Sequence, residues 1–144
     1  MKLAAVLAAK GNRVFTTASA TSIRGAVAEL ATNNIGALIV LSENGLPVGI
    51  LSERDIIREL SLRPNVLDSS VGDLMTSPVV CAASSDDLDS VLRTMTSRRF
   101  RHMPVVDEGE LVGMVTIADL VKAQLIEFRG AVDTLETRLM ETST

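Results

Sequence analysis

The chain has 144 residues, of which 47% are apolar, so it can bury the core of one domain or of a closely packed pair of small ones. Its net charge of -4 and its lack of Trp and Tyr argue against a nucleic-acid-binding surface, which needs a basic face and stacking rings. Its one cysteine excludes an internal disulfide, and no apolar run is long enough to span a membrane, so we expect a soluble protein of a reducing, cytoplasmic compartment.

The sequence from residue 14 to residue 60 predicts a strand, a helix, a strand, a turn, a strand and a second helix, in that order. Apolar residues at helical spacing follow Thr21, which is the expected N-cap of the first helix. The short apolar runs ALIVL and VGILS flank the turn signal SENG, which predicts a hairpin. The closing helix of this unit is expected to begin at Ser52.

The sequence from residue 79 to residue 124 repeats this order of elements. The offset is 65 residues at Val14 and Val79, and 64 after the shorter turn DEG. The apolar pattern is repeated together with several identical residues, and Asp86 takes the place of the expected N-cap. Each half is therefore one supersecondary unit that needs its twin to bury its apolar face. A linker with Pro64 and a short helical turn near Val71 joins the two units.

Both units end in the same short motif: a glycine, two apolar residues, a hydroxyl residue, two variable positions and an aspartate. The hydroxyl and acidic residues are Ser52 with Asp55, and Thr116 with Asp119. An aspartate in the first turn of a helix offers two acceptor oxygens to the 2′ and 3′ hydroxyls of a ribose, while the N-cap lies beside free N–H groups that stabilise a phosphate. The alternative is that these residues only cap their helices. Two copies in register favour the ligand-binding interpretation.

This duplicated β-α-β-β-α unit resembles the CBS domain pair, also called a Bateman module. The resemblance covers nearly the whole chain and implies an α+β fold, in which the two CBS units pack as a disc about an approximate twofold axis. It implies a first unit at residues 1–64 with the N-terminal segment, a linker and second unit at 65–124, and a C-terminal helix at 125–144. Pairs of this family commonly bind adenosine nucleotides such as AMP, ADP, ATP, NAD(H) or S-adenosylmethionine in two clefts between the units.

The resemblance also assigns candidate ligand-binding residues to the two clefts. The first cleft would be formed by Ser52, Asp55, Thr76, Pro78, Val80 and His102. The second would be formed by Thr116 and Asp119, with Arg101 on phosphate and Lys10, Arg13, Phe15, Gly36 and Ala37 around the base. Arg54 is expected either in its own cleft or in solvent. Arg101 replaces the glycine equivalent to Gly36, so the two clefts are expected to differ chemically.

The basic cluster before the second hairpin is the main source of positive charge for a phosphate. Strand alternation predicts that Arg101 and His102 project to opposite sides and serve different clefts. Arg98 and Arg99 are interpreted as a solvated helix end that interacts with the helix dipole. Because His102 is the only histidine, no metal site is expected.

No catalytic constellation is present in the sequence, and we therefore expect no enzyme and no catalytic cofactor. Two functions remain. In the first, the chain is a stand-alone sensor whose clefts hold AMP, ATP or NAD(H) and which acts in trans on a regulated protein. In the second, the clefts do not bind and the chain is a dimeric interaction scaffold. The two aspartates, the two hydroxyl residues and Arg101 favour the sensor.

The C-terminal segment predicts a homodimer contact. Its apolar residues recur at intervals of four and three, which is the rhythm of a coiled-coil seam: Val121, Leu125, Phe128, Val132, Leu135 and Leu139. Gly130 weakens an isolated helix, so this segment is expected to need a packing partner. The alternative is that the helix folds back on its own sheet.

Overall fold

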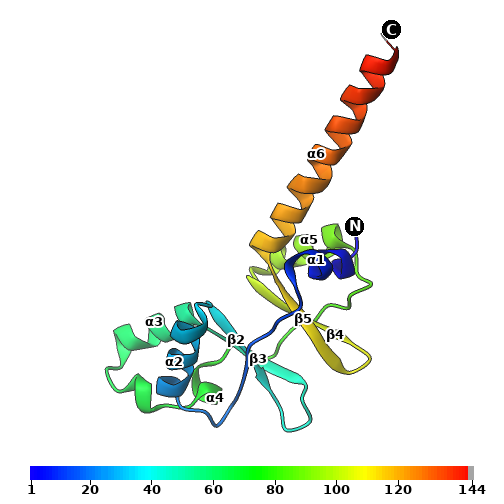
Figure 1. Cartoon of the computed structure of the whole chain (residues 1–144). Coiled ribbons are helices and arrows are strands. Elements are labelled where there is room, and N and C mark those ends of the chain that lie inside the picture. The colour runs from blue at the N-terminus through cyan, green and yellow to red at the C-terminus, as the bar shows by residue number, and fades with distance from the viewer. Residues whose placement is uncertain (143–144) are drawn as a thin grey trace.

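The first unit has the element order that the sequence predicts. The computed structural model describes residues 1–142 and contains two α/β units joined by a linker (Figure 1). The elements of the first unit are β1 (Thr16–Ala18), α2 (Ile23–Asn33), β2 (Ala37–Leu41), β3 (Pro47–Ser52) and α3 (Glu53–Leu62). In its sheet, β1 pairs with β2 in parallel and β2 pairs with β3 antiparallel. The expected hairpin is therefore confirmed.

The second unit repeats the helices and the hairpin but not the first strand. Its elements are α5 (Leu88–Arg98), β4 (His102–Asp107), β5 (Glu110–Thr116) and α6 (Ile117–Thr142). The predicted strand before α5 is reduced to a single parallel bridge between Ala82 and Val105. Backbone bonds from Ala82 N to Pro104 O and from Val106 N to Ala82 O hold this bridge. The chain therefore still lies along β4, but over too short a distance to form a strand.

The N-caps of α2 and α5 lie one residue beyond the predicted positions. Ser22 caps α2 and accepts a hydrogen bond from the Gly25 backbone N–H, so the prediction of Thr21 was wrong. Asp87 caps α5 and accepts from the Asp89 backbone N–H. The carboxylate of Asp86, the predicted cap, accepts instead from the backbone N–H of Ala83 within the preceding turn. The adjacent aspartates thus divide turn formation and helix capping between them.

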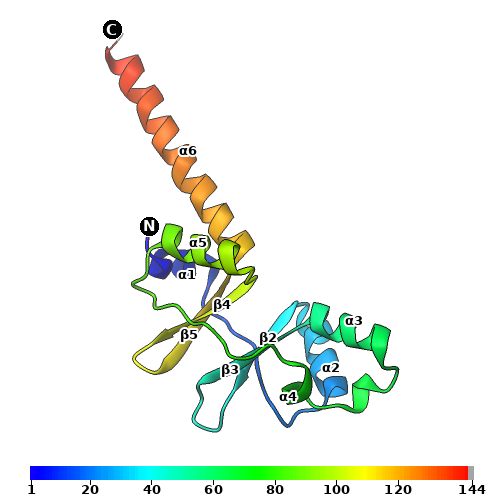
Figure 2. The same cartoon turned by 180° about the vertical axis from the view of Figure 1, so that it is seen from behind.

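Each unit is preceded in the chain by a short helix that packs on the other unit, so the two helices are exchanged. Helix α1 (Leu3–Lys10) contributes apolar side chains to the core of the second unit, although residues 1–64 were grouped with the first unit by chain order. The linker, with η1 (Val66–Asp68) and α4 (Val71–Leu74), contributes to the core of the first unit. Figure 2 shows α1 beside α5 and α4 close to α2 and α3.

Matching hydrogen bonds show that this exchange follows the approximate twofold axis. The bond from Leu3 N to Asp86 O, at 3.0 Å, has a counterpart from Val71 N to Thr21 O, at 2.8 Å. Ala4 N to Ser84 O in the second unit likewise corresponds to Gly72 N to Ser19 O in the first. Residues 1–10 thus relate to the second unit as residues 69–78 relate to the first.

Helix α6 extends away from the two units for most of its length (Figure 1). The alternative that it folds back on its own sheet is wrong. Leu120, near the start of α6, is buried in the core of the second unit, but seven of its other large apolar side chains are exposed along the helix, and gathered exposed apolar groups mark interaction surfaces. The exposed side chains are Val121, Leu125, Ile126, Phe128, Leu135, Leu139 and Met140. Among the described residues, no helix is both long and apolar enough to cross a lipid bilayer.

Candidate functional site

A cleft of about 610 Å³ lies between the two units, and we call it the Asp55 cleft. The first unit supplies the end of β3 and the first turns of α3, and the linker supplies Thr76. The second unit supplies the segment between α5 and β4. The lining residues are Gly36, Ile50, Ser52, Glu53, Arg54, Asp55, Ile57, Arg58, Thr76, Arg99, Phe100, Arg101 and His102.

Ser52 and Asp55 form a capping box at the start of α3. The Asp55 Oδ2 atom accepts from the backbone N–H and from the hydroxyl of Ser52, both at 2.9 Å, and Asp55 N donates to Ser52 Oγ at 3.2 Å. The capping role considered from the sequence is therefore present. The Oδ1 atom of Asp55 has no hydrogen bond within residues 1–142 and remains available to a ligand hydroxyl on the cleft wall.

Four arginines line the Asp55 cleft: Arg54 and Arg58 from α3, and Arg99 and Arg101 from the second unit. None of them forms an ion pair with a carboxylate in the described part of the chain. Only two acidic residues, Glu53 and Asp55, share the cleft with them. The cleft therefore has an excess of positive charge, in a protein whose net charge is -4.

Arg101 and His102 line the same cleft, so the prediction that strand alternation separates them was wrong. The physical reason is that β4 begins at His102, and Arg101 belongs to the preceding bend, where alternation does not apply. Burial and the positive charge of Arg101 hold the pKa of His102 below its ordinary value of 6.5, against the opposing effects of Asp119 and Asp55. His102 thus interacts electrostatically with both aspartates.

The second hydroxyl–aspartate motif has a different partner. Asp119 Oδ2 accepts from the Thr116 backbone N–H at 2.9 Å, as in a capping box, and also forms an ion pair with Lys10 Nζ at 2.5 Å. Burial would raise the pKa of the Asp119 carboxyl, but the hydrogen bonds from Lys10 and Thr116 and the charge of Lys10 lower it below its ordinary value. Three of the residues assigned to the second cleft are thus brought together here.

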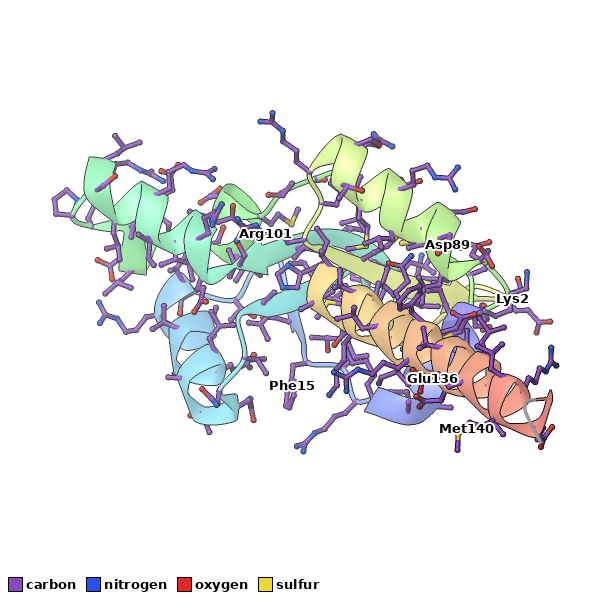
Figure 3. All side chains as sticks on the ribbon, turned by 90° about the horizontal axis from the view of Figure 1, so that it is seen from above. Lys2, Phe15, Asp89, Arg101, Glu136 and Met140 are labelled. Carbon is purple, nitrogen blue, oxygen red and sulfur yellow. The ribbon has the colours of Figure 1, made fainter. Side chains whose placement is uncertain are left out.

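The other predicted site residues are divided among several places. Gly36 and Arg101 were assigned to the second cleft but line the Asp55 cleft. Ala37 is buried in β2, opposite Ser52 in the hairpin register. The guanidinium carbon of Arg13 lies 4.8 Å from the centre of the Phe15 ring. In Figure 3, Phe15 and Arg101 are on opposite sides of the strands.

Two residues of the predicted first cleft are not part of its wall. Pro78 is exposed and follows Thr76 by two positions. Val80 lines a second, smaller depression of about 330 Å³ beside α5, together with Cys81 and Met103. The linker therefore contributes to the Asp55 cleft at Thr76 alone.

Sequence reasoning missed several lining residues, of which Arg58 and Arg99 matter most. Arg58 lies one helical turn after Arg54, which was already a candidate, so residues four apart on the same helix face could have identified it. Arg99 is the exposed C-cap of α5, as the interpretation of a solvated helix end has it, but it also lines the cleft, which that interpretation did not include. Its backbone has a φ of 60°, in the left-handed region where α5 ends, which turns the chain toward the cleft. A helix C-cap cannot be distinguished from a last helical turn by charge pattern.

The side chains of the cleft suit an anionic or hydroxylated ligand. Guanidinium groups form strong, bidentate hydrogen bonds with phosphate, and an aspartate oxygen accepts from a sugar hydroxyl. Within residues 1–142, no group of three His, Cys, Asp or Glu side chains is arranged to hold a metal ion.

Two repeated α/β units, the second with its first strand reduced to one bridge, and the arginine-lined cleft between them define the chain as a tandem module of the α+β class. Residues 12–62 and 71–126 each match the CBS domain, and the chain belongs to the CBS domain family. CBS domains are regulatory modules and are generally not catalytic.

Solved structures of this family are similar to the chain over most of its length. The CBS-domain-containing protein ATU1752 from Agrobacterium tumefaciens is 34% identical, with a TM-score of 0.81 over 86% of this chain and 99% of that one. The CBS domain pair of protein MJ0100, in complex with 5′-methylthioadenosine and S-adenosyl-L-methionine, is 26% identical, with a TM-score of 0.77 over 88% and 98%. CBSX2 in complex with AMP is 28% identical, with a TM-score of 0.71 over 86% and 96%.

Curated relatives are longer than the region that matches. The chain spans 68%, 39% and 55% of the length of three of them, to which it is 33%, 32% and 32% identical.

Proposed function

We propose that this chain is an adenosine-nucleotide-binding regulatory module that holds AMP, ATP or NAD(H) in the Asp55 cleft and reports the ligand to a partner protein. The ribose is held by Asp55 Oδ1 and the Ser52 hydroxyl, because both groups belong to the cleft wall. The phosphates lie among the four arginines. The ligand is bound and released without chemical change.

The observation that carries this proposal is the combination of one ribose acceptor with four arginines that have no carboxylate partner. Like charges gathered in one cleft repel one another, and a bound polyanion removes that cost. Arg54 and Arg58 belong to the first unit, whereas Arg99 and Arg101 belong to the second. A phosphate between them would therefore bind both units at once and respond to their relative position.

The similar structures hold adenosine ligands of different charge. AMP is anionic, whereas S-adenosylmethionine carries a sulfonium cation. The excess of guanidinium groups in the Asp55 cleft favours the phosphate-bearing class in this chain, since a cationic ligand would add to the existing repulsion.

The output of the module is proposed to pass through α6 and a second copy of the chain. Phe128 and Leu135 are 68% and 58% exposed, on the face that the heptad spacing predicts as a seam. Pairing of two such helices would cover this face and give a homodimer.

A non-binding dimeric scaffold is the alternative function. It is favoured by the capping boxes, because Asp55 and Asp119 already have a structural role at their helix N-termini. It does not account for the four arginines.

Isothermal titration calorimetry with AMP, ADP, ATP, NAD and NADH tests the proposal. Ligand at a hundred times its dissociation constant is expected to add about 2.7 kcal/mol to the free energy of unfolding and to raise Tm by about 2 to 8 °C. An absence of heat and of a Tm shift with every nucleotide at millimolar concentration would establish the scaffold instead.

A further inference from the structure

Lys10 corresponds to Pro78 when the two exchanged segments are aligned by the contacts that they make. The exchanged segments correspond residue by residue, since Leu3 and Ala4 bond the second unit as Val71 and Gly72 bond the first. In the same alignment Leu7 is equivalent to Met75. Leu7 covers Gly113, and Met75 covers Gly49, the glycines that begin the two motifs. Three residues further along, the alignment makes Lys10 equivalent to Pro78.

The two segments differ in how long they remain helical. Helix α4 ends at Leu74, and the chain then runs extended, so that Thr76 exchanges backbone hydrogen bonds with Ile50 at 2.9 and 3.1 Å. Helix α1 continues to Lys10 through an alanine-rich stretch without proline. Within residues 1–142, α1 forms no equivalent backbone pairing with Met114, the counterpart of Ile50. The Lys10 ammonium group instead donates to the Met114 carbonyl oxygen at 2.9 Å.

The same ammonium group contacts the carboxylate of the second motif at Asp119 Oδ2, the oxygen that also accepts from the Thr116 backbone N–H. Its counterpart Asp55 Oδ2 accepts from the Ser52 hydroxyl, which is neutral and can rotate toward a ligand. The Lys10 contact is charged and is fixed between two acceptors. Both side chains are half-buried, at 31% and 25% exposure, so solvent screens the pair less than a fully exposed one.

The position of Lys10 is set by the packing of α1. Leu3, Val6 and Leu7 are buried in the core of the second unit, and Leu7 lies against Gly113. Lys10 follows Val6 by one helical turn, so the buried face of α1 directs the lysine to the second motif.

We infer that Lys10 is an internal cation that neutralises the carboxylate of the second motif and lies against it, so that the chain binds nucleotide at the Asp55 cleft alone. This inference rests on the proposed function, and it replaces the assignment of Lys10 as a ligand contact. The two motifs, although equivalent in sequence, then have different roles: Asp55 binds ligand, and Asp119 attaches α1 to the second unit.

The test is the number of nucleotides bound per chain, measured by native mass spectrometry and calorimetry with ATP. At an ATP concentration that half-saturates the parent protein, the parent and Asp119→Asn are each expected to show one site, and Asp55→Asn little or no occupancy. Lys10→Met keeps the aliphatic stem but removes the charge, and it is expected to bind two. Combining it with Asp119→Asn should return the number to one. Lys122→Met, an exposed lysine on α6, is the matched control and should bind one.

Two outcomes would overturn the inference. One is a parent protein that binds two nucleotides and loses one on Asp119→Asn. The other is a folded Lys10→Met variant that still binds one. If the parent and Lys10→Met bind none, the proposed function fails, and the ion pair is tested without ligand. The Tm losses of Lys10→Met and Asp119→Asn should then be less than additive in the double variant, and additive losses would show that the pair is not formed.

Discussion

Leu7 of α1 lies directly over Gly113 of β5: a Cβ atom at residue 113 would come within 2.8 Å of Leu7 Cδ2. The matching contact in the first unit is between Gly49 and Met75, where a Cβ atom would come within 2.5 Å of the Met75 sulfur. The glycine of each motif is thus required because the exchanged segment packs on it. The glycine is therefore repeated in both motifs because each unit receives, at this position, a side chain from the segment that precedes the other unit.

Gly113→Ala should therefore displace α1 and lower the free energy of unfolding by about 1–3 kcal/mol, the usual cost of overpacking a core. Leu7 cannot move away easily, because α1 is held by Leu3 and Val6 in the same core. Chemical denaturation measures the change. Gly130→Ala, on the exposed part of α6 with nothing within 4 Å, is the control and should stabilise the helix by about 1 kcal/mol. Equal effects at the two glycines would contradict this account of Gly113.

The ribose acceptor is tested by Asp55→Asn, which keeps a side-chain oxygen for the N-cap but removes the charge. Binding of ATP is expected to weaken by about 1.5–3 kcal/mol, the contribution of a hydrogen bond to a charged group. The fold should survive, and the free energy of unfolding, measured by denaturation, should fall by no more than a helix-cap substitution causes, about 0.5–2 kcal/mol. Unchanged affinity in a folded variant would show that Asp55 serves only as a cap.

The arginines predict that affinity increases with the number of phosphates. ATP should bind more tightly than ADP, and ADP more tightly than AMP, with S-adenosylmethionine weakest. Arg58→Ala and Arg99→Ala should each weaken ATP binding by about 1.5–3 kcal/mol and AMP binding by less, because fewer phosphates reach them. Calorimetry at two salt concentrations separates the charge effect. Arg63→Ala is the matched control, since its guanidinium already pairs with Glu59 at 3.0 Å. Equal binding of AMP and ATP would contradict the role given to these arginines.

The depressed pKa of His102 makes stability depend on pH. In the unfolded chain this group gains its proton near its ordinary value of 6.5, whereas in the folded protein it does so only at lower pH. The unfolded state therefore binds more protons in that window, and the free energy of unfolding falls as the pH is lowered through 6.5. Denaturation at pH 7.5, 6.5 and 5.5 should show the fall, and His102→Gln should reduce it. An identical slope in the variant would assign the effect to other groups.

The sequence predicted the order of elements and the hydroxyl–aspartate motifs because both depend on local patterns. Alternation and helical spacing identify strands and helices, and a hydroxyl three positions before an aspartate identifies a helix start. The first strand of the second unit was overpredicted because Ala82 and its neighbours have strand-like composition but form only one bridge.

The partners of the site residues were not predictable in the same way. Lys10 reaches Asp119 only because α1 is exchanged onto the second unit, and that contact joins residues far apart in the sequence. Arg99 enters the Asp55 cleft through a left-handed backbone conformation, which no pattern of charges indicates. Residues of the right type were therefore found, but Gly36 and Arg101 were assigned to the other cleft, and Arg99 was assigned to neither.

The exposed face of α6 predicts association through that helix. Phe128→Asp with Leu135→Asp places charges on the proposed seam, where a charge buried without a partner would oppose pairing. Light scattering at high micromolar concentration should show a dimer for the parent chain and a monomer for this double variant. Thr134→Asp with Thr137→Asp is the matched control, because it adds the same charge to the same helix away from the heptad positions. Nucleotide binding should be unchanged in both, since the Asp55 cleft contains no residue of α6. A monomeric parent, or a seam variant that stays dimeric, would show that α6 does not pair two copies. If the control variant lost the dimer equally, the added net charge and not the seam would explain the effect.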